Sequence, residues 1–470
     1  MWNFSQFGTN TAAVSVGGEK LSYGELIDEN RKLAAEIGGR CLVFLLCTNS
    51  IGALEGYTAF LNHGIVPLLI PADMDRELLE NLIETYKPDY LWIPQDMRER
   101  FSEYSTKYAA YQYELVDTGY EKCYPLNDEL CLLLTTSGST GSPKLVRQSY
   151  KNVLANAEAI AEYLELDSTE RPITTLPMNY TYGLSIINSH LLVGATLLLV
   201  NKGIMQKEFW TFFKEKEATS FGGVPYTYEM LDKLKFSRMD LPSLRTMTQA
   251  GGKLSPELHK KFAKYAIESG KRFFVMYGQA EATARMSYLP YEKSLEKYGS
   301  MGIAIPGGRF SVIDFDGKEI KTPDTAGELV YQGPNVTLGY AECGEDLSKG
   351  DERNGCLFTG DIAQFDKDGY YYIVGRKKRF LKIFGNRVNL DEIDQIVKDK
   401  FGNIECVSSG RDDQMFLFIT EEAYKETIRK YLSEKTGLNS AAFIVKTLNQ
   451  IPRNDSGKIQ YKELEPYMTL

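Results

Sequence analysis

The sequence predicts an α/β protein. It should have a large N-terminal domain of helix-covered, mainly parallel sheets, an antiparallel β subdomain, and a small C-terminal α+β domain. Short apolar segments alternate with helical patterns through roughly the first 300 residues. Beyond them, short alternating strands are separated by Asp-Gly and Gly-Pro turns. A basic run followed by a helix start marks the last part of the chain.

The first half of the chain carries a repeated strand–helix–strand pattern. Residues 41–47 (CLVFLLC) and 65–70 (IVPLLI) are predicted strands, and residues 50–62 between them have apolar side chains at helical spacing. Pro67 weakens the second strand assignment, because proline cannot donate to a strand ladder. Parallel strands joined in this way need helices on both faces of the sheet. Further strands are predicted at 130–136, 172–177, 195–200, 244–249 and 272–277, with a helix at 256–269.

The last third of the chain predicts two smaller units. Residues from about 300 to 377 should form an antiparallel, barrel-like or meander β subdomain. Asn389 and Glu392 then match a capping box, followed by an apolar face at helical spacing. We therefore place the N-terminal domain at residues 1–377 and the C-terminal domain at residues 378–470.

Composition narrows the classes of function. The 470 residues have a net charge of −9, which argues against nucleic acid as a partner and against a polybasic membrane anchor. The longest apolar stretch, residues 191–200, is short of the about 20 residues that span a bilayer. The first residues do not resemble a secretory signal. Seven cysteines without a CxxC pair favour reduced thiols. We expect a cytoplasmic protein with no membrane span.

Histidine is scarce in this chain. His63, His190 and His259 are the only three, and none has a second histidine or a cysteine at metal-ligand spacing. A zinc site and a Ser-His-Asp triad are therefore disfavoured. If the protein is an enzyme, its chemistry should not need an imidazole base.

The segment LLLTTSGSTGSPK, residues 132–144, predicts a phosphate-binding loop. Its glycines let the backbone approach a ligand, its hydroxyls and amides can bond phosphate oxygens, and its lysine supplies a positive charge. It differs from a Walker A motif, which has Gly-Lys where this chain has Pro143-Lys144. By composition alone it could also be a Ser/Gly-rich turn. The candidate residues are Thr136, Ser137, Gly138, Ser139, Thr140, Gly141 and Lys144.

This segment resembles the phosphate-loop signature of the adenylate-forming ligase superfamily. That superfamily includes acyl-CoA synthetases, luciferases and the adenylation domains of peptide synthetases. Five further segments resemble its motifs and occur in the same order, so the resemblance covers most of the chain from residue 132 to residue 459. They are 277–281 (YGQAE), 327–340 (GELVYQGPNVTLGY), 359–361 (TGD), 375–387 (GRKKRFLKIFGNR) and 451–459 (IPRNDSGKI).

The second of these motifs, Tyr277-Gly278-Gln279-Ala280-Glu281, is expected to bind the nucleotide and its metal. The resemblance implies that the Tyr277 ring stacks on adenine and that Glu281 binds the Mg²⁺ of ATP, an ion that prefers oxygen ligands. Ala280 stands where the family usually has threonine. The hydroxyl that would reach the α-phosphate is then missing, a loss of about 1–3 kcal/mol if nothing replaces it.

The remaining motifs imply further roles. By resemblance, Asp361 accepts hydrogen bonds from the ribose hydroxyls, as a carboxylate suits a cis-diol. Arg376 contacts the ribose and phosphate, and Lys378 occupies the hinge position. Gly385 falls where the family passes a pantetheine arm close to the backbone. Lys458 is the lysine of the adenylation step, which bridges the substrate carboxylate and the α-phosphate.

The acid pocket is expected at residues 177–185, 221–226 and 250–252. No acidic residue lies between positions 177 and 190, which disfavours an α-amino acid, because its buried ammonium would lack a partner. Fatty, short-chain, hydroxy and aryl acids all remain open, with Ala280 and the two tyrosines slightly favouring an aryl or compact acid. The candidate acid-binding residues are Tyr180, Tyr182, Gly183, Val224 and Ala250, with Gly251 and Gly252 assigned to the nucleotide.

The resemblance implies an AMP-forming acid–thiol ligase. Such an enzyme uses ATP and Mg²⁺ to convert a carboxylic acid to an acyl-adenylate, then passes the acyl group to coenzyme A or to the phosphopantetheine of a separate acyl or peptidyl carrier protein. Lys458, Glu281 and Arg376 would be catalytic, and the small domain would rotate about Lys378 between the two steps. Since carboxylates are ionised at pH 7, no base is needed, which fits the shortage of histidine.

Three other functions remain open at this point. The chain could be an amino-acid or aryl-acid adenylating enzyme that loads a separate carrier protein. It could be a non-catalytic nucleotide-binding relative, which Ala280 favours and which Lys458, Glu281, Asp361 and Arg376 disfavour. It could also be a luciferase-like oxygenase, because luciferases share these motifs.

Overall fold

The structure is a computed structural model that describes residues 1–135, 144–314, 316–383, 386–402, 404–411, 413–453 and 459–468. Contacts divide the chain into two compact units. The larger unit holds residues 1–310 and 331–357, and the smaller holds residues 311–330 and 358–470. This division follows from contacts within the chain, and it does not identify the residue about which the small domain would rotate. The boundary at residues 377 and 378 therefore stays a prediction.

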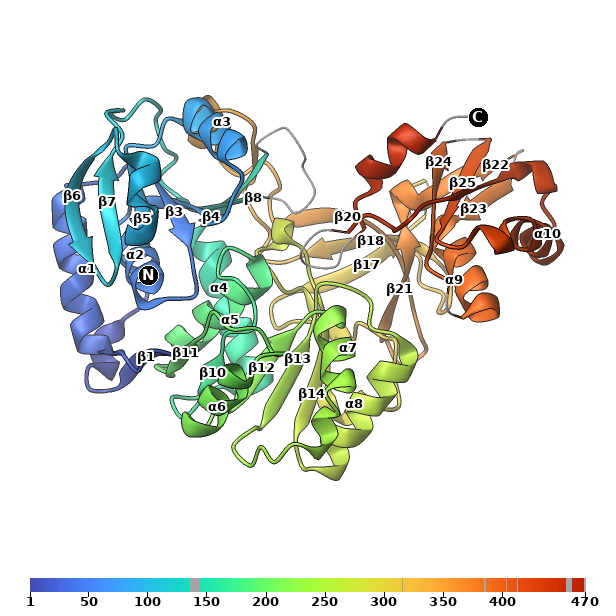
Figure 1. Ribbon diagram of the computed structural model, residues 1–470, viewed down its shortest axis with the longest axis horizontal. Helices are drawn as coiled ribbons and strands as arrows, with labels where there is room; N and C mark the ends of the chain where they lie inside the picture. Colours follow the sequence, from blue (N-terminus) through green and yellow to red (C-terminus); the bar gives the residue numbers. More distant parts are fainter. Residues whose placement is uncertain are drawn as a thin grey trace. The chain divides into compact units, whose positions relative to one another are not determined.

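An eight-stranded sheet forms one half of the larger unit, with the order β19-β9-β8-β4-β3-β5-β7-β6 over the described residues (Figure 1). Its central strands β8, β4, β3 and β5 are parallel, and the outer ones are antiparallel. The strands predicted at 41–47, 65–70 and 130–136 are confirmed, with Pro67 inside β4 opposite Val43. The strands are β3 (Leu42–Cys47), β4 (Val66–Pro71), β5 (Tyr90–Pro94), β6 (Ser105–Ala110), β7 (Tyr113–Asp117), β8 (Leu130–Thr135), β9 (Leu145–Ser149) and β19 (Gly339–Ala341).

A nine-stranded sheet forms the other half, with the order β16-β15-β14-β13-β12-β10-β11-β1-β2 over the described residues. Strands from β1 to β14 in this order are parallel, as the βαβ pattern predicts. Strand β10 has two residues, shorter than the predicted 172–177. The strands are β1 (Thr11–Ser15), β2 (Lys20–Ser22), β10 (Pro172–Ile173), β11 (Leu197–Leu199), β12 (Ser220–Gly223), β13 (Thr246–Gln249), β14 (Arg272–Tyr277), β15 (Ser287–Leu289) and β16 (Ile303–Ala304).

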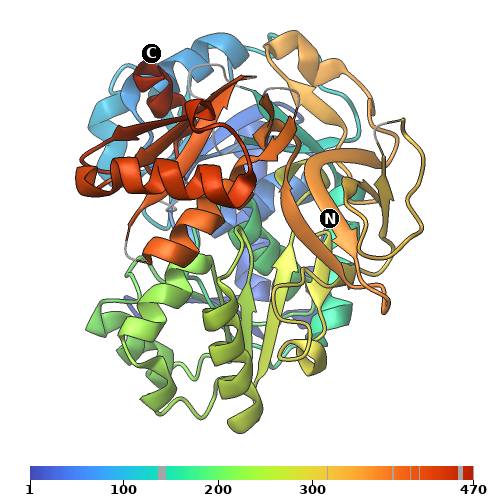
Figure 2. The ribbon, with the colours of Figure 1, turned by 90° about the vertical axis from the view of Figure 1, so that its right-hand side faces the viewer.

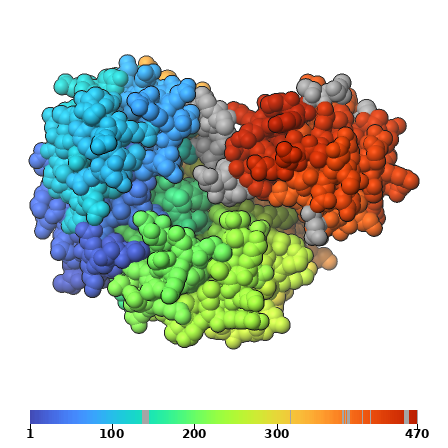
Figure 3. Space-filling view, in the orientation of Figure 1, coloured from blue at the N-terminus to red at the C-terminus, as the bar shows by residue number. Residues whose placement is uncertain are grey.

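Helices cover both sheets of the larger unit. One continuous core joins β1 and β11 of the nine-stranded sheet to β3 and β8 of the eight-stranded sheet through helices α1, α2 and α5. The two lobes therefore lie side by side, as the blue and green parts of Figure 3 show. Helix α3 covers the other face of the eight-stranded sheet. The helices are α1 (Tyr23–Ile37), α2 (Ile51–Asn62), α3 (Arg76–Tyr86), α4 (Tyr150–Leu164), α5 (Thr181–Leu192), α6 (Lys207–Glu215), α7 (Pro225–Lys233) and α8 (Pro256–Glu268).

A four-stranded sheet follows, with the order β17-β18-β20-β21 over the described residues. Its strands are β17 (Arg309–Ile313), β18 (Gly327–Gln332), β20 (Cys356–Phe365) and β21 (Tyr371–Arg376). Strands β20 and β21 are antiparallel, with Asp361 opposite Arg376. The segment between β18 and β20 leaves this sheet, because its strand β19 pairs with β9. That excursion brings residues 337–353 into the larger unit.

The C-terminal part of the smaller unit is an α+β fold. Helices α9 and α10 pack on one face of the sheet β24-β25-β26, and the other face is covered by residues around Leu464 (Figure 2). Asn389 caps α9, but its side-chain oxygen accepts from the Asp391 amide and its side-chain nitrogen donates to the Val374 carbonyl. The reciprocal capping box with Glu392 is therefore wrong. The elements are β22 (Phe380–Ile383), β23 (Asn386–Asn389), α9 (Leu390–Phe401), β24 (Cys406–Arg411), β25 (Gln414–Ile419), α10 (Lys425–Thr436) and β26 (Phe443–Thr447).

Among the described residues, no helix is both long enough and apolar enough to cross a bilayer.

A buried carboxyl group lies in the core of the larger unit. Glu55 on α2 is fully buried, and neither of its carboxyl oxygens has a hydrogen-bond partner among the described residues. Burial, with a smaller contribution from the negative charge of Glu29, raises the pKa of Glu55 from 4.5 to about 8. At neutral pH the group is therefore mainly protonated, since the ionised form would be an unpaired buried charge.

We expect Glu55 to make the protein less stable as the pH rises from about 5 to about 8. In that window the folded chain keeps a proton that the unfolded chain has released, so the free energy of unfolding falls by up to about 1.4 kcal/mol per pH unit. Glu55→Gln should flatten this slope in chemical denaturation between pH 5 and 8.5. The exposed Glu84 of α3 provides the control Glu84→Gln. A slope unchanged by Glu55→Gln would contradict the assignment.

Candidate functional site

The predicted metal ligand, Glu281, lies just after the end of β14. Tyr277 is the last residue of that strand, and Glu281 sits in a short 3₁₀ turn, Ala280–Ala282. Gly278 is required in between, because a Cβ atom there would lie 1.7 Å from the carbonyl oxygen of Ala284. The strand end and the tight turn together present the Glu281 carboxylate at a half-buried position.

Glu281 is held at both its side chain and its backbone by the segment that carries β19. The hydroxyl of Tyr340 donates to Glu281 Oε1 at 2.6 Å. The Glu281 carbonyl accepts from the amide and hydroxyl of Thr337 at 3.0 and 2.9 Å, and from Arg353 Nη1 at 2.9 Å. Three side chains from a distant part of the sequence therefore fix the orientation of this carboxylate.

Two cations lie over the ring of Tyr340. Lys144 Nζ is 4.0 Å from the ring centroid, and Arg353 Cζ is 4.5 Å from it. Burial and the charge of Glu281 raise the pKa of the Tyr340 phenol to about 12, although Arg353 opposes the shift. The phenol is therefore protonated at neutral pH and acts as the donor to Glu281. Lys144 also pairs with Glu342 at 3.4 Å.

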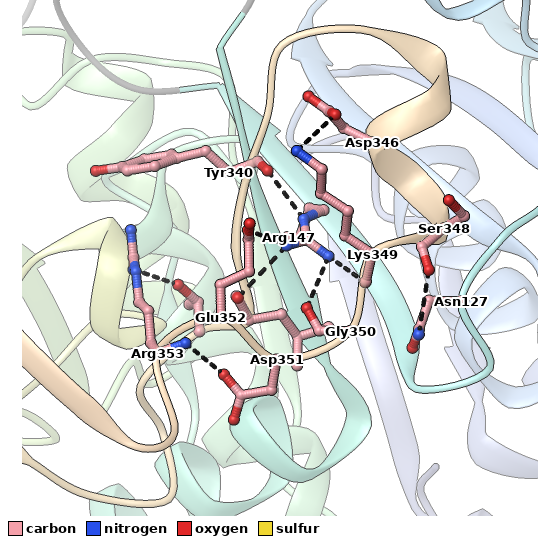
Figure 4. A network of polar contacts seen from close by, with 12 residues as sticks. Asn127, Arg147, Tyr340, Asp346, Ser348, Lys349, Gly350, Asp351, Glu352 and Arg353 are labelled. Carbon is pink, nitrogen blue, oxygen red and sulfur yellow. Dashed lines mark hydrogen bonds and ion pairs between the residues drawn. The ribbon is translucent and has the colours of Figure 1, made fainter.

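A buried arginine holds this segment in place. Arg147, on β9, has a fully buried side chain whose Nε donates to the carbonyl of Tyr340 at 3.0 Å. Its Nη1 donates to the carbonyls of Lys349 and Gly350, and its Nη2 to Glu352 Oε2 at 2.5 Å (Figure 4). One guanidinium group therefore fastens both β19 and the loop after it to the strand that begins beside Lys144.

The backbone near Glu281 is strained. Thr283 has a φ of 65°, which is rare for a β-branched residue. Its hydroxyl donates to the Asn335 carbonyl at 2.7 Å, and its own carbonyl accepts from the Thr181 hydroxyl. Strain of this kind persists only where surrounding contacts hold it, and it is frequent at functional sites.

The predicted acid-binding residues come together. Tyr182, Val224 and Ala250 belong to one buried cluster, with Tyr180 packed against it. The Tyr182 hydroxyl bonds that of Thr248 at 2.7 Å, and the rings of Tyr180 and Tyr182 meet edge to face with centroids 6.4 Å apart. Burial raises the pKa of both phenols, so both are neutral.

The glycines of this region permit close packing. Gly251 has a φ of 82°, and a Cβ atom on it would lie 2.5 Å from the Tyr180 hydroxyl. A Cβ atom on Gly183 would lie 2.3 Å from the Pro177 carbonyl oxygen, so this glycine packs the start of α5 against the preceding turn. Gly252 is more open, with the Pro225 ring 3.1 Å from its ideal Cβ position. Gln249 donates to the Gly252 carbonyl at 2.9 Å, which shapes the turn.

Two residues that are predicted to bind the nucleotide, Asp361 and Arg376, lie close together in the smaller unit. Arg376 Nε lies 3.2 Å from Asp361 Oδ1 across the β20–β21 pair. The Asp361 side chain is 5% exposed, whereas that of Arg376 is 71% exposed. The amide of Asp361 donates to the Thr359 hydroxyl at 3.1 Å, which orders the turn of the Thr-Gly-Asp motif. Arg376 can therefore hold the carboxylate and still reach a ligand.

Several predicted residues cannot be placed. Thr136, Ser137, Gly138, Ser139, Thr140 and Gly141 of the phosphate loop lie outside the described residues, as do Gly385 and Lys458.

Two other predicted residues are placed by the structure. Lys378 lies in the 3₁₀ turn Lys377–Arg379. Gln279 lies beside Tyr277, whose hydroxyl it contacts at 3.1 Å.

The donor set suits a magnesium ion better than a metal held by protein alone. Among the residues that the structure describes, no group of three or more histidine, cysteine, aspartate or glutamate side chains could hold a metal ion. Mg²⁺ commonly takes only one or two carboxylates and completes its shell with water and substrate phosphates. A single oriented carboxylate, Glu281, fits that pattern.

Sequence reasoning missed four side chains of this region: Arg147, Arg285, Tyr340 and Arg353. Tyr340 ends the segment 327–340, in which the sequence analysis assigned no site residue. A usable signal existed for Arg147, because β9 (LVRQS) is a fully buried strand that contains a charged residue. Buried charges need partners, so its presence predicts a polar network. The partners themselves come from residues 340–352 and have no local signal.

Comparisons with known proteins identify the family and the fold. Residues 2–341 match the family model described as AMP-binding enzyme. The oxalate–CoA ligase of Arabidopsis thaliana is 30% identical over 362 residues, which cover 71% of this chain and 66% of that protein. A long-chain-fatty-acid–CoA ligase of Escherichia coli O157:H7 is 29% identical over 360 residues, covering 72% and 61%. The matches thus span less than two thirds of these relatives' lengths.

Solved structures share the fold. O-succinylbenzoate coenzyme A synthetase (MenE) of Bacillus subtilis, in complex with AMP, has a TM-score of 0.77 at 20% identity, covering 98% of this chain and 97% of that one. The anthranilate CoA ligase AuaEII, in complex with anthranoyl-AMP, has a TM-score of 0.76 at 19% identity, covering 99% and 95%. At these identities the likeness establishes the fold. With the family match over residues 2–341, it follows that the chain belongs to the AMP-binding enzyme family.

Proposed function

We propose that this protein is an AMP-forming acid–thiol ligase, which activates a small-molecule carboxylic acid with ATP and transfers the acyl group to a thiol. One observation carries the proposal: the Glu281 carboxylate is oriented by the Tyr340 hydroxyl at 2.6 Å, beside the cations Lys144 and Arg353. This is the arrangement that a metal–polyphosphate ligand requires. Family membership supports the same reaction class.

The reaction needs fixed charges more than it needs a base. A carboxylate is ionised at pH 7 and is itself the nucleophile toward the α-phosphate. The barrier lies in bringing two anions together and in stabilising the charge that develops on phosphate. Lys144 and the phosphate loop that precedes it would contact the phosphates. His190 and His259 are buried and have pKa values lowered to about 4, mainly by burial, so neither is a cation at neutral pH.

Glu281 would hold Mg²⁺, which when bound neutralises part of the phosphate charge. Tyr340 keeps the Glu281 carboxylate in one orientation, and Arg353 holds the backbone of the same residue. In the smaller unit, Asp361 would accept hydrogen bonds from the ribose, with Arg376 positioned beside it. Lys458 would bridge the two reacting groups. Lys378 would serve as the hinge and Gly385 as the close passage for the thiol arm.

The names of relatives support coenzyme A as the acceptor. The oxalate–CoA ligase, the peroxisomal OPC-8:0-CoA ligase 1 of Arabidopsis thaliana and the long-chain-fatty-acid–CoA ligases are all named as CoA ligases. Phosphopantetheine on a separate carrier protein is the second candidate acceptor, because it presents the same thiol arm. We propose a cytoplasmic location, because seven cysteines without a CxxC pair favour reduced thiols.

The function is tested by acid-dependent exchange of pyrophosphate into ATP over a panel of fatty, aryl, hydroxy and amino acids. We expect exchange with at least one acid, followed by thioester formation with coenzyme A. Lys458→Ala should abolish exchange, because the cation between the reacting groups is lost, yet it should spare thiolysis of a preformed acyl-adenylate. Equal loss of both steps would contradict the hinge, and no exchange with any acid would favour a non-catalytic relative.

Tyr340→Phe should lower the rate of exchange by about 10- to 100-fold, because it removes a hydrogen bond to a charged carboxylate. The expected change is a weaker apparent affinity for Mg²⁺ with the fold intact. Tyr23→Phe is the control, since it also removes a tyrosine hydroxyl that donates a hydrogen bond, in this case a fully buried one to the Ala195 carbonyl at 2.7 Å. Identical effects of the two substitutions would show that Tyr340 serves stability alone.

A further inference from the structure

A buried arginine beside the candidate acid pocket has no carboxylate among its described partners. Arg285 is 2% exposed. Its Nε donates to the Ser185 hydroxyl at 3.0 Å, and its Nη1 contacts the Tyr163 hydroxyl at 3.0 Å and the Met276 sulfur at 3.4 Å. Its remaining contact is with the Tyr182 ring, 5.2 Å from Cζ to the centroid. All these partners are electrically neutral.

The hydrogen-bonding capacity of this guanidinium is not used up. Arginine has five N–H donors in a planar fork. Among the described residues, Nη2 has no hydrogen-bond partner, whereas Nε and Nη1 do. Buried arginines are normally paired, because removing a cation from water is costly unless an anion compensates. Arg147 shows the usual solution in the same unit, with Glu352 at 2.5 Å.

Arg285 is also held rigidly. The side chain of Asn156 donates to the Arg285 carbonyl at 2.8 Å, and Asn335 donates to the same carbonyl at 3.1 Å. The Arg285 amide in turn donates to Asn156 Oδ1 at 3.4 Å. A backbone clamped from two sides presents the charge without much loss of side-chain freedom when a ligand binds.

The neighbours of Arg285 are the residues expected to bind the acid. Tyr163 and Met276 belong to the same buried cluster as Tyr182, Val224 and Ala250. Ser185 and Tyr182 are both on α5, one helical turn apart. The cation therefore lies directly behind the Tyr182 ring. A nearby histidine does not compete for an anion, because burial lowers the pKa of His190 to about 4, with the charge of Arg285 adding to the shift.

We propose that Arg285 binds a second carboxylate of the substrate, so that the preferred acids are compact dicarboxylic acids. This inference rests on the proposed ligase function. One carboxylate of the substrate would react at the α-phosphate. The second carboxylate would accept hydrogen bonds from Nη2 of Arg285 and neutralise this buried cation. An unbranched fatty acid would instead bring methylene groups against this charge. Long-chain fatty acids are therefore poor substrates.

The test compares matched pairs of acids in pyrophosphate exchange with the full-length protein. In each pair, a methyl group or hydrogen is replaced by a carboxylate: butanoate and succinate, pentanoate and glutarate, benzoate and phthalate. We expect the best diacid to exceed its partner in kcat/KM by at least about 30-fold, as a buried charge pair implies. Equal rates, or faster exchange with the monoacids, would overturn the inference; a water molecule or chloride ion at Arg285 gives that result.

Two variants connect this preference to the residue. Arg285→Met keeps the volume but removes the charge, and it should lose the diacid advantage while the monoacid rate changes by less than about threefold. Arg285→Lys keeps the charge without the fork and should retain a reduced advantage. Arg272→Met is the control, since Arg272 is the first residue of β14 and its guanidinium is already paired with a carboxylate, that of Glu165 at 3.0 Å. A diacid advantage that survives Arg285→Met overturns the inference.

A binding measurement separates this inference from the ligase function. The diacid alone should raise the melting temperature of the wild-type protein and of Arg272→Met, but not that of Arg285→Met. If Arg285→Met does not fold, Arg285→Lys decides the outcome, because its diacid advantage should fall while its monoacid rate persists. Pyrophosphate exchange with monoacids only would contradict the dicarboxylate inference but would still support the ligase function. Failure of every acid to support exchange would remove the ligase function itself.

Discussion

The candidate site depends on one buried guanidinium group. Arg147 is fully buried on β9 and bonds the backbone of Tyr340 as well as the carbonyls and the carboxylate of residues 349–352. Together with the pairing of β19 with β9, it keeps the segment from β18 to β20 against the eight-stranded sheet. Because that segment supplies Tyr340, Thr337 and Arg353, the orientation of Glu281 follows from the burial of Arg147. A single desolvated cation is thus compensated by contacts that also organise the surface above it.

The positively charged side chains of the larger unit differ in their burial. Lys144 and Arg353 lie over the Tyr340 ring at partly exposed positions, where they can meet a phosphate that arrives from solvent. Arg285 is buried beside the Tyr182 ring, and its described partners are all neutral. The neutral histidines and the protonated tyrosines add no competing charge. The site therefore resembles a set of fixed cations around two places for anions, which is what a reaction between a carboxylate and a phosphate needs.

Local patterns predicted much of the fold. The apolar strands β3, β4, β8 and β14 and the helices α2, α8 and α9 lie close to where their patterns indicated. Motif residues at strand ends, such as Tyr277 and Gly278, also lie where a ligand can approach. The failures have physical causes. Of the strand predicted at 172–177, only Pro172 and Ile173 pair with neighbouring strands. The capping box of α9 fails because the side-chain oxygen of Asn389 accepts from the amide of Asp391 and not from that of Glu392.

The sequence by itself determined the class of fold, the family and the types of residue available for chemistry, because strand and helix periodicity and short motifs are local properties of the chain. It could not show that Tyr340 donates to Glu281 or that Arg147 holds Tyr340, since these partners are 59 and 193 positions apart. Nor could it show that Arg285 is buried beside Tyr182 with neutral partners only. Burial and the identity of a charged group's neighbours arise when distant segments pack together, so only the tertiary structure decided which cations face solvent and which one is buried among neutral partners.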